Sequence, residues 1–466
     1  MTDLVQTGLL FFGLSFLGYG VLRWPRSTQI GHGERLVLGL VVMLGLVPLV
    51  LFFGLLAGHT LDVIPVWLLA VGALLGVGLW GHDLYQTRRT GPWQTAPRSS
   101  SAWSPLRIAL IALVMLFLIE RIVFAGFQGL LFPTYFWDAV ANWNYRAQIF
   151  FSTQRLDLDP GSAMFLGGGT SHYPPGPSLF RAWMATLVGK WSEPVVAAHS
   201  IVVYLLFFAM IWIRLATRIG RTCALFLAYV AVSLPLMAYH AYAGYADLLL
   251  SLLLTGCLMY GYEFITTRDA LSGLVSALLL AGCLFVKNEG IGLFLPVIIV
   301  TMAGLLWSRQ LSAKSAALYL GIVVFWILPW VVLKAYFGLP YGPTGSTGFA
   351  IHVEGLGQMV NVLFLQGSFN LFGVFLVFTA CLFAPVWWRT EVRWLALPVL
   401  LLIGAILAVF LLTENYAFLK NPVTINRTLL IWMPSYIYLA GVSAAKKWGG
   451  NDNEGGNLAS GGMGHL

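Results

Sequence analysis

The sequence predicts an all-α polytopic membrane protein, and three observations support this fold class. Only 9% of the 466 residues are charged and 59% are hydrophobic, whereas a soluble domain has about 25% charged residues. The mean hydropathy is +0.83. Apolar runs long enough to cross a bilayer recur along most of the chain. This pattern excludes both a soluble globule and a soluble domain carried by a single anchor.

About 13 apolar segments have the length of a membrane span. The N-terminal stretch MTDLVQTG lacks a basic region and a cleavage site, so it reads as the first span and not as a signal peptide. We expect the spans near residues 4–22, 36–57, 63–81, 107–126, 194–213, 222–240, 247–264, 270–286, 290–307, 316–336, 370–387, 394–413 and 428–445.

The basic residues orient this chain, because cytoplasmic connections of membrane proteins carry an excess of Lys and Arg. With the N-terminus outside, 17 of the 26 basic residues fall in inner connections and nine in outer ones. The pattern therefore predicts an outer N-terminus and a cytoplasmic C-terminus. It also accounts for the net charge of +8 without nucleic acid, since the basic residues are scattered between apolar segments. The nine outer basic residues each need a separate explanation. They are Arg121, Arg146, Arg155, Arg181, Lys190, Lys287, Lys334, Lys420 and Arg427.

The chain divides into four parts by composition. The core is expected to carry two large outer loops, at about 127–193 and 337–369. The parts are extra N-terminal helices at 1–81, a Ser-, Pro-, Thr- and Arg-rich cytoplasmic linker at 82–106, a transmembrane catalytic core at 107–445, and a disordered cytoplasmic tail at 446–466.

The first outer loop is expected to contain an interfacial helix at 137–151 and a second short helix at 177–189. Helical spacing predicts one lipid-facing stripe and a separate polar face. The predicted stripe is Trp137, Val140, Trp143, Ala147 and Phe151, and the polar face is Asp138, Asn142 and Tyr145.

Two acidic residues are candidates for catalysis. Asp138 lies among aromatic residues, and a partly desolvated carboxylate is suited to act as a general base. Asp247 begins a span at its outer end, where a carboxylate is costly unless it faces a cavity or a partner. The alternative for both is a structural role as a helix N-cap.

Three further sites carry cationic or polar candidates. Lys287, Asn288 and Glu289 form an outer turn, either as phosphate or sugar contacts or as a surface Lys–Glu pair. Arg427 begins the last span, where it either binds phosphate bidentately or snorkels to headgroups. Lys420 is a weaker candidate of the same kind.

Prolines 174 and 175 stiffen the end of the first outer loop, next to two further candidates. His172 and Tyr173 either contact a ligand there or are ordinary polar loop residues. No residue cluster resembles a zinc site, and no glycine motif cradles phosphate. The four cysteines, Cys223, Cys257, Cys283 and Cys381, all lie in apolar runs and read as small core residues.

Taken together, these motifs resemble the GT-C glycosyltransferases, polytopic enzymes with lipid-linked sugar donors that include protein O-mannosyltransferases and the aminoarabinose transferase of lipid A. The resemblance covers about 107–445. It departs from the family at Ala139, where a second acid is common, and at His172, where some relatives have Lys. The motifs that carry it are FWDAVANWNYRAQ, HYPPGPSLF, GYADLLLS, VKNEG and INRTLL.

The resemblance implies inverting transfer of a sugar from a polyprenyl-phosphate donor to an extracytoplasmic hydroxyl on an envelope glycan, lipid or protein. Asp138 is then the base, Asp247 orients the acceptor or sugar, and Arg427 stabilises the leaving phosphate with Lys287 or His172. The aromatic residues of 135–145 would stack on the sugar. No cofactor is required, although two carboxylates are able to hold a divalent ion such as Mg²⁺ or Mn²⁺. The implied location is a bacterial plasma (inner) membrane.

Two other functions remain open. A polysaccharide ligase or polymerase with a lipid-diphosphate donor would favour arginines in the second outer loop, and residues 337–369 contain none. A transporter or flippase would favour repeats and charges at mid-membrane, whereas here the ionisable residues gather at the ends of spans.

Overall fold

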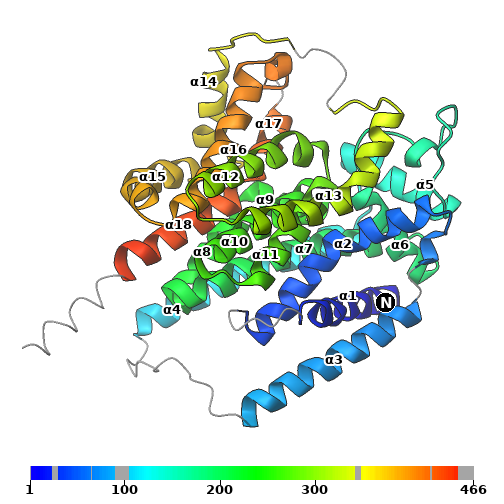
Figure 1. Cartoon of the computed structure of the whole chain (residues 1–466), viewed down its shortest axis with the longest axis horizontal. Helices are drawn as coiled ribbons and strands as arrows, with labels where there is room; N and C mark the ends of the chain where they lie inside the picture. The colour runs from blue at the N-terminus through cyan, green and yellow to red at the C-terminus, as the bar shows by residue number, and fades with distance from the viewer. Residues whose placement is uncertain are drawn as a thin grey trace, which may run out of the picture.

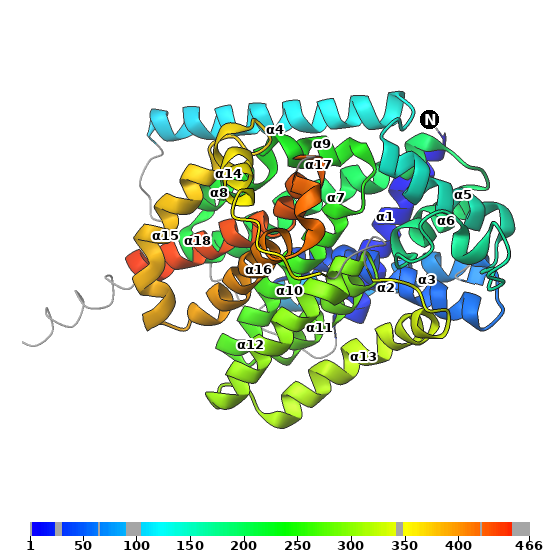
Figure 2. The same cartoon turned by 90° about the horizontal axis from the view of Figure 1, so that it is seen from above.

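The chain is all-α, as predicted. The computed structural model describes residues 2–23, 30–63, 66–89, 104–341, 348–419 and 422–449. Within these ranges the only β-structure is one isolated bridge between Phe349 and Thr413. Figure 1 shows the helices gathered into one bundle, and Figure 2 shows α4 along one edge of it.

The helices have the following bounds. The α-helices are α1 (Thr2–Val21), α2 (His32–Leu56), α3 (Val66–Arg89), α4 (Pro105–Leu131), α5 (Tyr145–Thr153), α6 (Gly176–Val188), α7 (Glu193–Ile219), α8 (Arg221–Ser233), α9 (Pro235–Ala243), α10 (Asp247–Thr267), α11 (Ala270–Leu284), α12 (Leu295–Trp307), α13 (Ala313–Tyr336), α14 (Gly355–Val360), α15 (Phe372–Arg389), α16 (Arg393–Leu411), α17 (Pro422–Leu430) and α18 (Met433–Trp448). Short 3₁₀ or π turns are η1 (Leu61–Val63), η2 (Ala139–Asn144), η3 (Phe165–Gly167), η4 (Gly290–Phe294), η5 (Asn361–Leu365) and η6 (Glu414–Leu419).

Every predicted span contains helix, but the number of true crossings differs from the expectation. Among the described residues, ten helices are long and apolar enough to cross a membrane, or 11 if the pair α8 and α9, bent by 64°, forms one span. Neither α3 nor α11, which has only 15 residues, meets that test. The span count of about 13 therefore stays a prediction.

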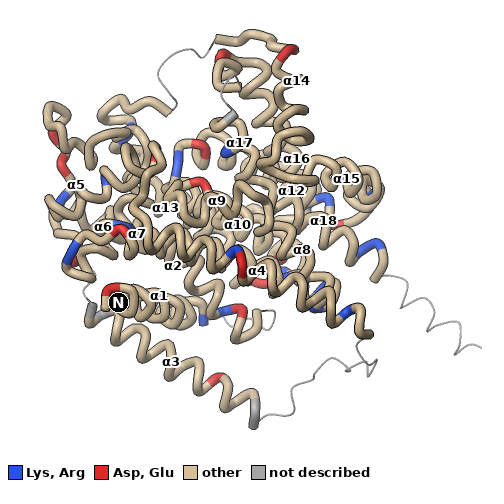
Figure 3. The backbone as a smooth tube through the Cα atoms, turned by 180° about the vertical axis from the view of Figure 1, so that it is seen from behind, with Lys and Arg blue, Asp and Glu red and all other residues tan. Residues whose placement is uncertain are grey.

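Helix ends that were expected on the same side of the membrane meet in the structure. Asp3, at the start of α1, pairs with Lys190 in the first large loop at 3.0 Å, and both were expected outside. Arg107, at the start of α4, donates to Thr222 at the start of α8, and both were expected inside. Figure 3 shows few charges along the long helices between the two ends of the bundle.

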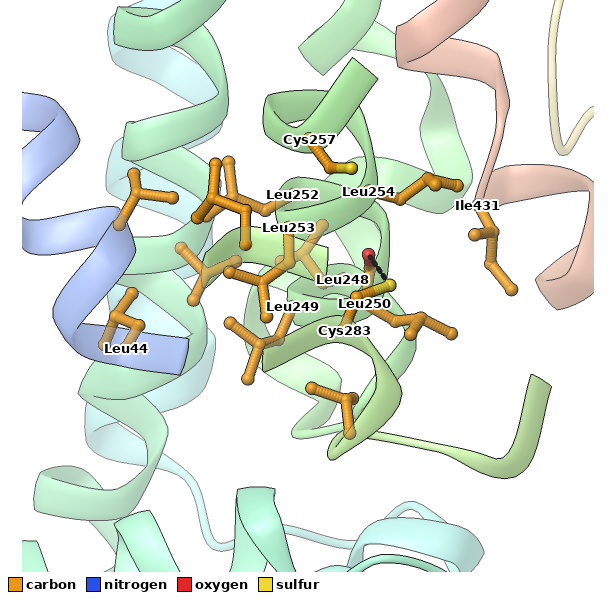
Figure 4. Close-up of a cluster of buried hydrophobic side chains, with 14 of the residues drawn as sticks. Leu44, Leu248, Leu249, Leu250, Leu252, Leu253, Leu254, Cys257, Cys283 and Ile431 are labelled. Carbon is orange, nitrogen blue, oxygen red and sulfur yellow. Dashed lines mark hydrogen bonds between the residues drawn. The ribbon is translucent and has the colours of Figure 1, made fainter. Parts of the chain in front are cut away.

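Helix α2 is an integral part of the bundle, although residues 1–81 were expected to be an addition to the core. It crosses α11 closely, because a Cβ atom on Gly282 would lie 2.9 Å from the Cα of Gly45. Small residues at a helix crossing allow this close approach in membranes. Figure 4 shows Leu44 beside the leucines of α10 in one buried cluster.

A buried ionic network fastens α2 to α7 and α10 at the predicted inner end. Arg214 on α7 donates to Glu34 of α2 at 3.0 Å and also pairs with Glu263 of α10. Tyr260 donates to Glu34 at 2.6 Å, and Arg218 reaches Glu263 at 2.6 Å. The carboxylates therefore have partners despite their burial, which offsets their desolvation.

Helices extend into both ends of the predicted 82–106 linker, further than composition indicated. Helix α3 continues to Arg89 and α4 begins at Pro105, where Ser104 caps it, so only the middle of the predicted 82–106 linker is free of described helix. Residues 90–103 lie outside the described residues, as do 450–466 of the tail.

The four cysteines differ in their exposure. Cys257 and Cys283 are buried as predicted, but Cys223 and Cys381 are exposed. In a membrane-spanning chain the outward-facing surface is apolar too, so hydropathy does not separate a packed face from a lipid face.

Replacing Arg214 with Met is expected to destabilise the protein by about 3 kcal/mol or more, because the substitution removes the cation that the buried carboxylates of Glu34 and Glu263 share. Thermal unfolding in detergent measures the effect. Lys446→Met is the matched control: it removes a half-exposed pair with Glu391 and is expected to change stability by less than about 1 kcal/mol. Equal stability of the two variants would contradict this account.

Candidate functional site

Arg427 lies at the centre of a charged cluster built from segments far apart in the sequence. Its Nε and Nη2 donate to Asp247 Oδ2 at 3.0 and 2.7 Å. Its Nη1 donates to Asp138 Oδ2. The guanidinium plane also lies over the ring of Tyr245, with Cζ 4.4 Å from the ring centroid. One arginine on α17 therefore joins the start of α10 to the segment that precedes η2.

The turn between α11 and η4 adds a second cation and a third carboxylate. Lys287 Nζ donates to Asp247 Oδ1 at 2.9 Å and pairs with Glu289 Oε1 at 2.7 Å. Asp247 thus has a cation on each carboxylate oxygen. The Lys287–Glu289 pair was one predicted alternative, but it is not a surface pair, because the Lys287 side chain is only 7% exposed.

The two catalytic candidates differ sharply in access to solvent. The Asp247 side chain is 1% exposed and the Asp138 side chain is 29% exposed. Ala246, not Asp247, occupies the N-cap position of α10, and the Asp138 side chain makes no capping hydrogen bond within the described residues. Both carboxylates therefore form ion pairs and do not cap a helix.

A π-helical turn directly follows Asp138 and changes the predicted faces of the interfacial helix. Trp137 and Val140 are exposed as predicted, but Trp143 is 2% exposed and Ala147 is fully buried. The expected lipid-facing stripe is therefore wrong beyond Val140. Residues 139–144 form η2, whose wider turn shifts every later side chain relative to a regular helix.

A second π-helical turn, η4, follows Glu289 in the same way. Pro296, two residues beyond its end, has no N–H to donate and its ring crowds the preceding turn, which is a local reason for the irregular hydrogen bonding. Both turns begin at a carboxylate of the cluster. Such turns often re-aim side chains at functional sites.

Two fully buried arginines hold the first outer loop against the cluster. Arg181 on α6 donates to Asn144 Oδ1 at 2.8 Å and to the Gly244 carbonyl at 2.7 Å. It thereby ties the end of η2 to the segment just before Asp247. Arg146 donates to the carbonyl of Leu166 at 2.8 Å. Both were counted among the unexplained outer basic residues, and both are structural.

Lys334, at the end of α13, is a residue that the sequence analysis did not select. Its side chain is buried, and its Nζ donates to the carbonyls of His172 and Pro340, each at 2.6 Å, and to Asn288 Oδ1 at 3.3 Å. No carboxylate pairs with it within the described residues. The sequence did carry one signal for Lys334, because it is one of the nine basic residues predicted on the outer side of the membrane.

His172 and Tyr173 lie beside the cluster without an ion pair to it. The Tyr173 ring packs against Trp143, and its centroid is 6.0 Å from Lys287 Nζ. Burial raises the pKa of Tyr173 to about 12. Burial, then the positive charges of Lys334 and Arg146, lowers the pKa of His172 below its usual range. The lowered pKa favours the neutral form of the His172 ring.

The remaining candidates make no hydrogen bond or ion pair to the cluster within the described residues. Trp137 is 79% exposed, Tyr145 lies against the backbone of Gly168 and Gly169, and Asn142 is half-buried. Lys420 lies outside the described residues. Two apolar pockets, one between α10, α12 and α16 and one between α8, α15 and α18, contain none of the candidate residues.

The described part of the chain contains no group of three or more His, Cys, Asp or Glu side chains arranged to hold a metal ion. The carboxylates of Asp138 and Asp247 face each other across the guanidinium of Arg427. This donor set does not fit a divalent ion, because a cationic side chain already occupies the space that the two carboxylates share.

The lowered pKa of His172 predicts a pH dependence of stability. Above its ordinary pKa the ring is neutral in both folded and unfolded chains. Below that pKa the unfolded chain binds the proton first, so stability is lost as the pH falls. Between about pH 7.5 and about pH 5, the wild-type melting temperature should fall more than that of His172→Gln. Parallel curves for the two proteins would refute the assignment.

Comparisons with known proteins place few constraints on the chain. No protein-family model matches it, and no curated protein matches its sequence. Among solved structures it is similar to ArnT from Cupriavidus metallidurans bound to undecaprenyl phosphate, with 18% identity and a TM-score of 0.47 over 78% of this chain and 64% of that one. The apo form of the same protein gives 17% identity and a TM-score of 0.45 over 76% and 64%. The chain thus spans less than two thirds of the length of that protein.

Proposed function

We propose that the chain is an integral-membrane glycosyltransferase that transfers a sugar from a polyprenyl-phosphate donor to an acceptor hydroxyl, with inversion, at the outer membrane face. One observation carries the proposal: Arg427 holds a partly exposed carboxylate and a buried carboxylate together at the ends of apolar helices. A base and a phosphate-binding cation are thus side by side where a lipid phosphate resides. The motifs of the GT-C glycosyltransferases agree with this reading.

Asp138 is the general base in this proposal. Direct displacement requires a group that removes the proton of the acceptor hydroxyl as the new glycosidic bond forms. Of the two carboxylates on Arg427, Asp138 is the accessible one, because its side chain is 29% exposed and that of Asp247 is 1% exposed. The exposed rings of Trp137 and Tyr145 flank the same segment and offer faces for a sugar.

Arg427 is the residue that receives the donor phosphate. A guanidinium binds phosphate oxygens through parallel N–H groups. Its Nη1 is the group paired with Asp138, so a phosphate that takes this N–H releases Asp138 from its cation. The base then becomes free to accept a proton only when the donor is in place. This exchange couples donor binding to catalysis within one side chain.

We propose a role for Asp247 that differs from the expected one, because Asp247 is buried and paired with two cations. It fixes the guanidinium of Arg427 through Nε and Nη2 and anchors Lys287 on its other oxygen. We therefore assign it to positioning of the cations, and not to contact with the acceptor. Lys287 is shared between Asp247 and Glu289, so we assign it to neutralising these carboxylates and leave the phosphate contact to Arg427.

Asp138→Asn tests the base. It is expected to fold and to bind donor but to lose about 100-fold or more of the transfer rate, because Asn cannot take the proton. The assay is sugar transfer in proteoliposomes with a panel of polyprenyl-phosphate sugars and a crude envelope acceptor. Wild-type activity in the variant would remove Asp138 from the mechanism.

The same assay separates the other functions. Turnover with a lipid-diphosphate donor alone would favour a ligase or polymerase. Movement of a lipid or solute across the vesicle membrane without sugar transfer by wild type would favour a transporter. Glu354→Gln, an exposed carboxylate of the second outer loop, is the matched control and is expected to be fully active.

Arg427→Lys tests the phosphate contact. Lysine keeps the positive charge but lacks the planar fork that reaches both carboxylates. The variant is expected to raise the KM for the donor by about 10-fold or more and to lower kcat because the carboxylates are no longer held together. Unchanged donor KM would show that the phosphate binds elsewhere.

A further inference from the structure

The turn at 287–289 presents a buried hydrogen-bond donor whose direction is fixed. Asn288 is 4% exposed, and its Oδ1 accepts from Lys334 Nζ at 3.3 Å. An ammonium group only donates, so the oxygen of the amide must face Lys334 and the NH₂ group must face the other way. Nδ2 is buried and has no hydrogen-bond partner within the described residues.

The next residue presents a buried acceptor. Glu289 Oε1 pairs with Lys287 Nζ at 2.7 Å, which leaves the second carboxylate oxygen. Oε2 is buried and likewise has no hydrogen-bond partner within the described residues. Buried polar atoms are nearly always satisfied, and an unsatisfied one costs free energy. Asn288 and Glu289 therefore each have one polar atom that could form a hydrogen bond with a ligand.

An unpaired donor and an unpaired acceptor on consecutive residues match a hydroxyl group, which accepts one hydrogen bond and donates another. A phosphate dianion fits poorly, because it offers no hydrogen and the Glu289 oxygen repels it. The local charges agree: Lys287, the cation beside Glu289, is already shared between Asp247 and Glu289, so an anion at this turn would meet a carboxylate whose cation is taken.

We infer that Asn288 Nδ2 and Glu289 Oε2 form a subsite for a hydroxyl of the donor sugar, and that Lys334 is the positioning residue that orients the Asn288 amide. The inference rests on the proposed function, which supplies the sugar. It divides the ligand between two places: the phosphate lies at Arg427, and one sugar hydroxyl lies at the 287–289 turn.

Binding of two probes to the full-length protein in nanodiscs tests this division. One probe is undecaprenyl phosphate, and the other is the same lipid carrying one neutral hexose, chosen from glucose, mannose and galactose by wild-type affinity. Asn288→Asp and Glu289→Gln keep the side-chain shape but remove the donor and weaken the acceptor. Each is expected to weaken binding of the sugar lipid by about 10-fold or more and to change binding of the bare lipid by less than about twofold.

Two substitutions of Lys334 separate orientation from general structure. Lys334→Met removes the donor that orients the Asn288 amide, so it is expected to lower the preference for the sugar lipid over the bare lipid. Lys334→Arg still only donates hydrogen bonds and should restore that preference. Glu354→Gln is the control, and melting temperatures check that each variant folds. A purely structural role of Lys334 would instead weaken both probes equally or neither.

The outcomes distinguish failure of the proposed function from failure of the hydroxyl subsite. If wild type binds neither probe, the proposed function fails and the subsite with it. If wild type binds both probes and the variants lose them equally, the turn contacts the phosphate and the hydroxyl subsite is wrong. If the variants bind the sugar lipid as wild type does, neither side chain contacts the sugar.

Discussion

The ion pairs of Arg427 are the interaction on which the rest of the site depends. They bring together Asp138 and Asp247, which lie 289 and 180 positions away from it in the sequence. Burying a carboxylate such as Asp247 at the end of a membrane helix is costly unless cations compensate it. Arg427 and Lys287 supply that compensation, so removal of either cation would leave one buried oxygen of Asp247 without its partner. The cluster therefore fixes how α10, α17 and the first outer loop sit relative to one another.

Much of the fold follows from the sequence because hydropathy and spacing are local signals. All thirteen predicted spans contain helix, and helix ends expected on one side do meet, as for Asp3 and Lys190. Which face of a helix packs inward does not follow, because lipid and protein core are both apolar. Trp143 illustrates a second reason. Its burial depends on the π-helical turn of η2, which a regular helical period does not anticipate.

The site was predictable in part for a similar reason. A carboxylate or cation at the outer end of a span is unusual enough to select Asp138, Asp247, Lys287 and Arg427 without a structure. The sequence carries no sign of their pairing, since it is set by tertiary contacts. Lys334 escaped selection because its partners are backbone carbonyls and an amide, groups that every segment contains.

The charges of the cluster suggest why its carboxylates outnumber its cations. A site with spare positive charge would hold a lipid phosphate tightly both before and after transfer. Here both cations of the cluster are already paired, so in the proposed mechanism the phosphate displaces Asp138 from Arg427 to bind. The free energy spent on breaking that pair lowers the affinity for the donor. It is recovered only when Asp138 takes a proton from the acceptor, since a protonated carboxyl no longer competes for the guanidinium. Interactions that strengthen along the reaction in this way favour turnover over ground-state binding.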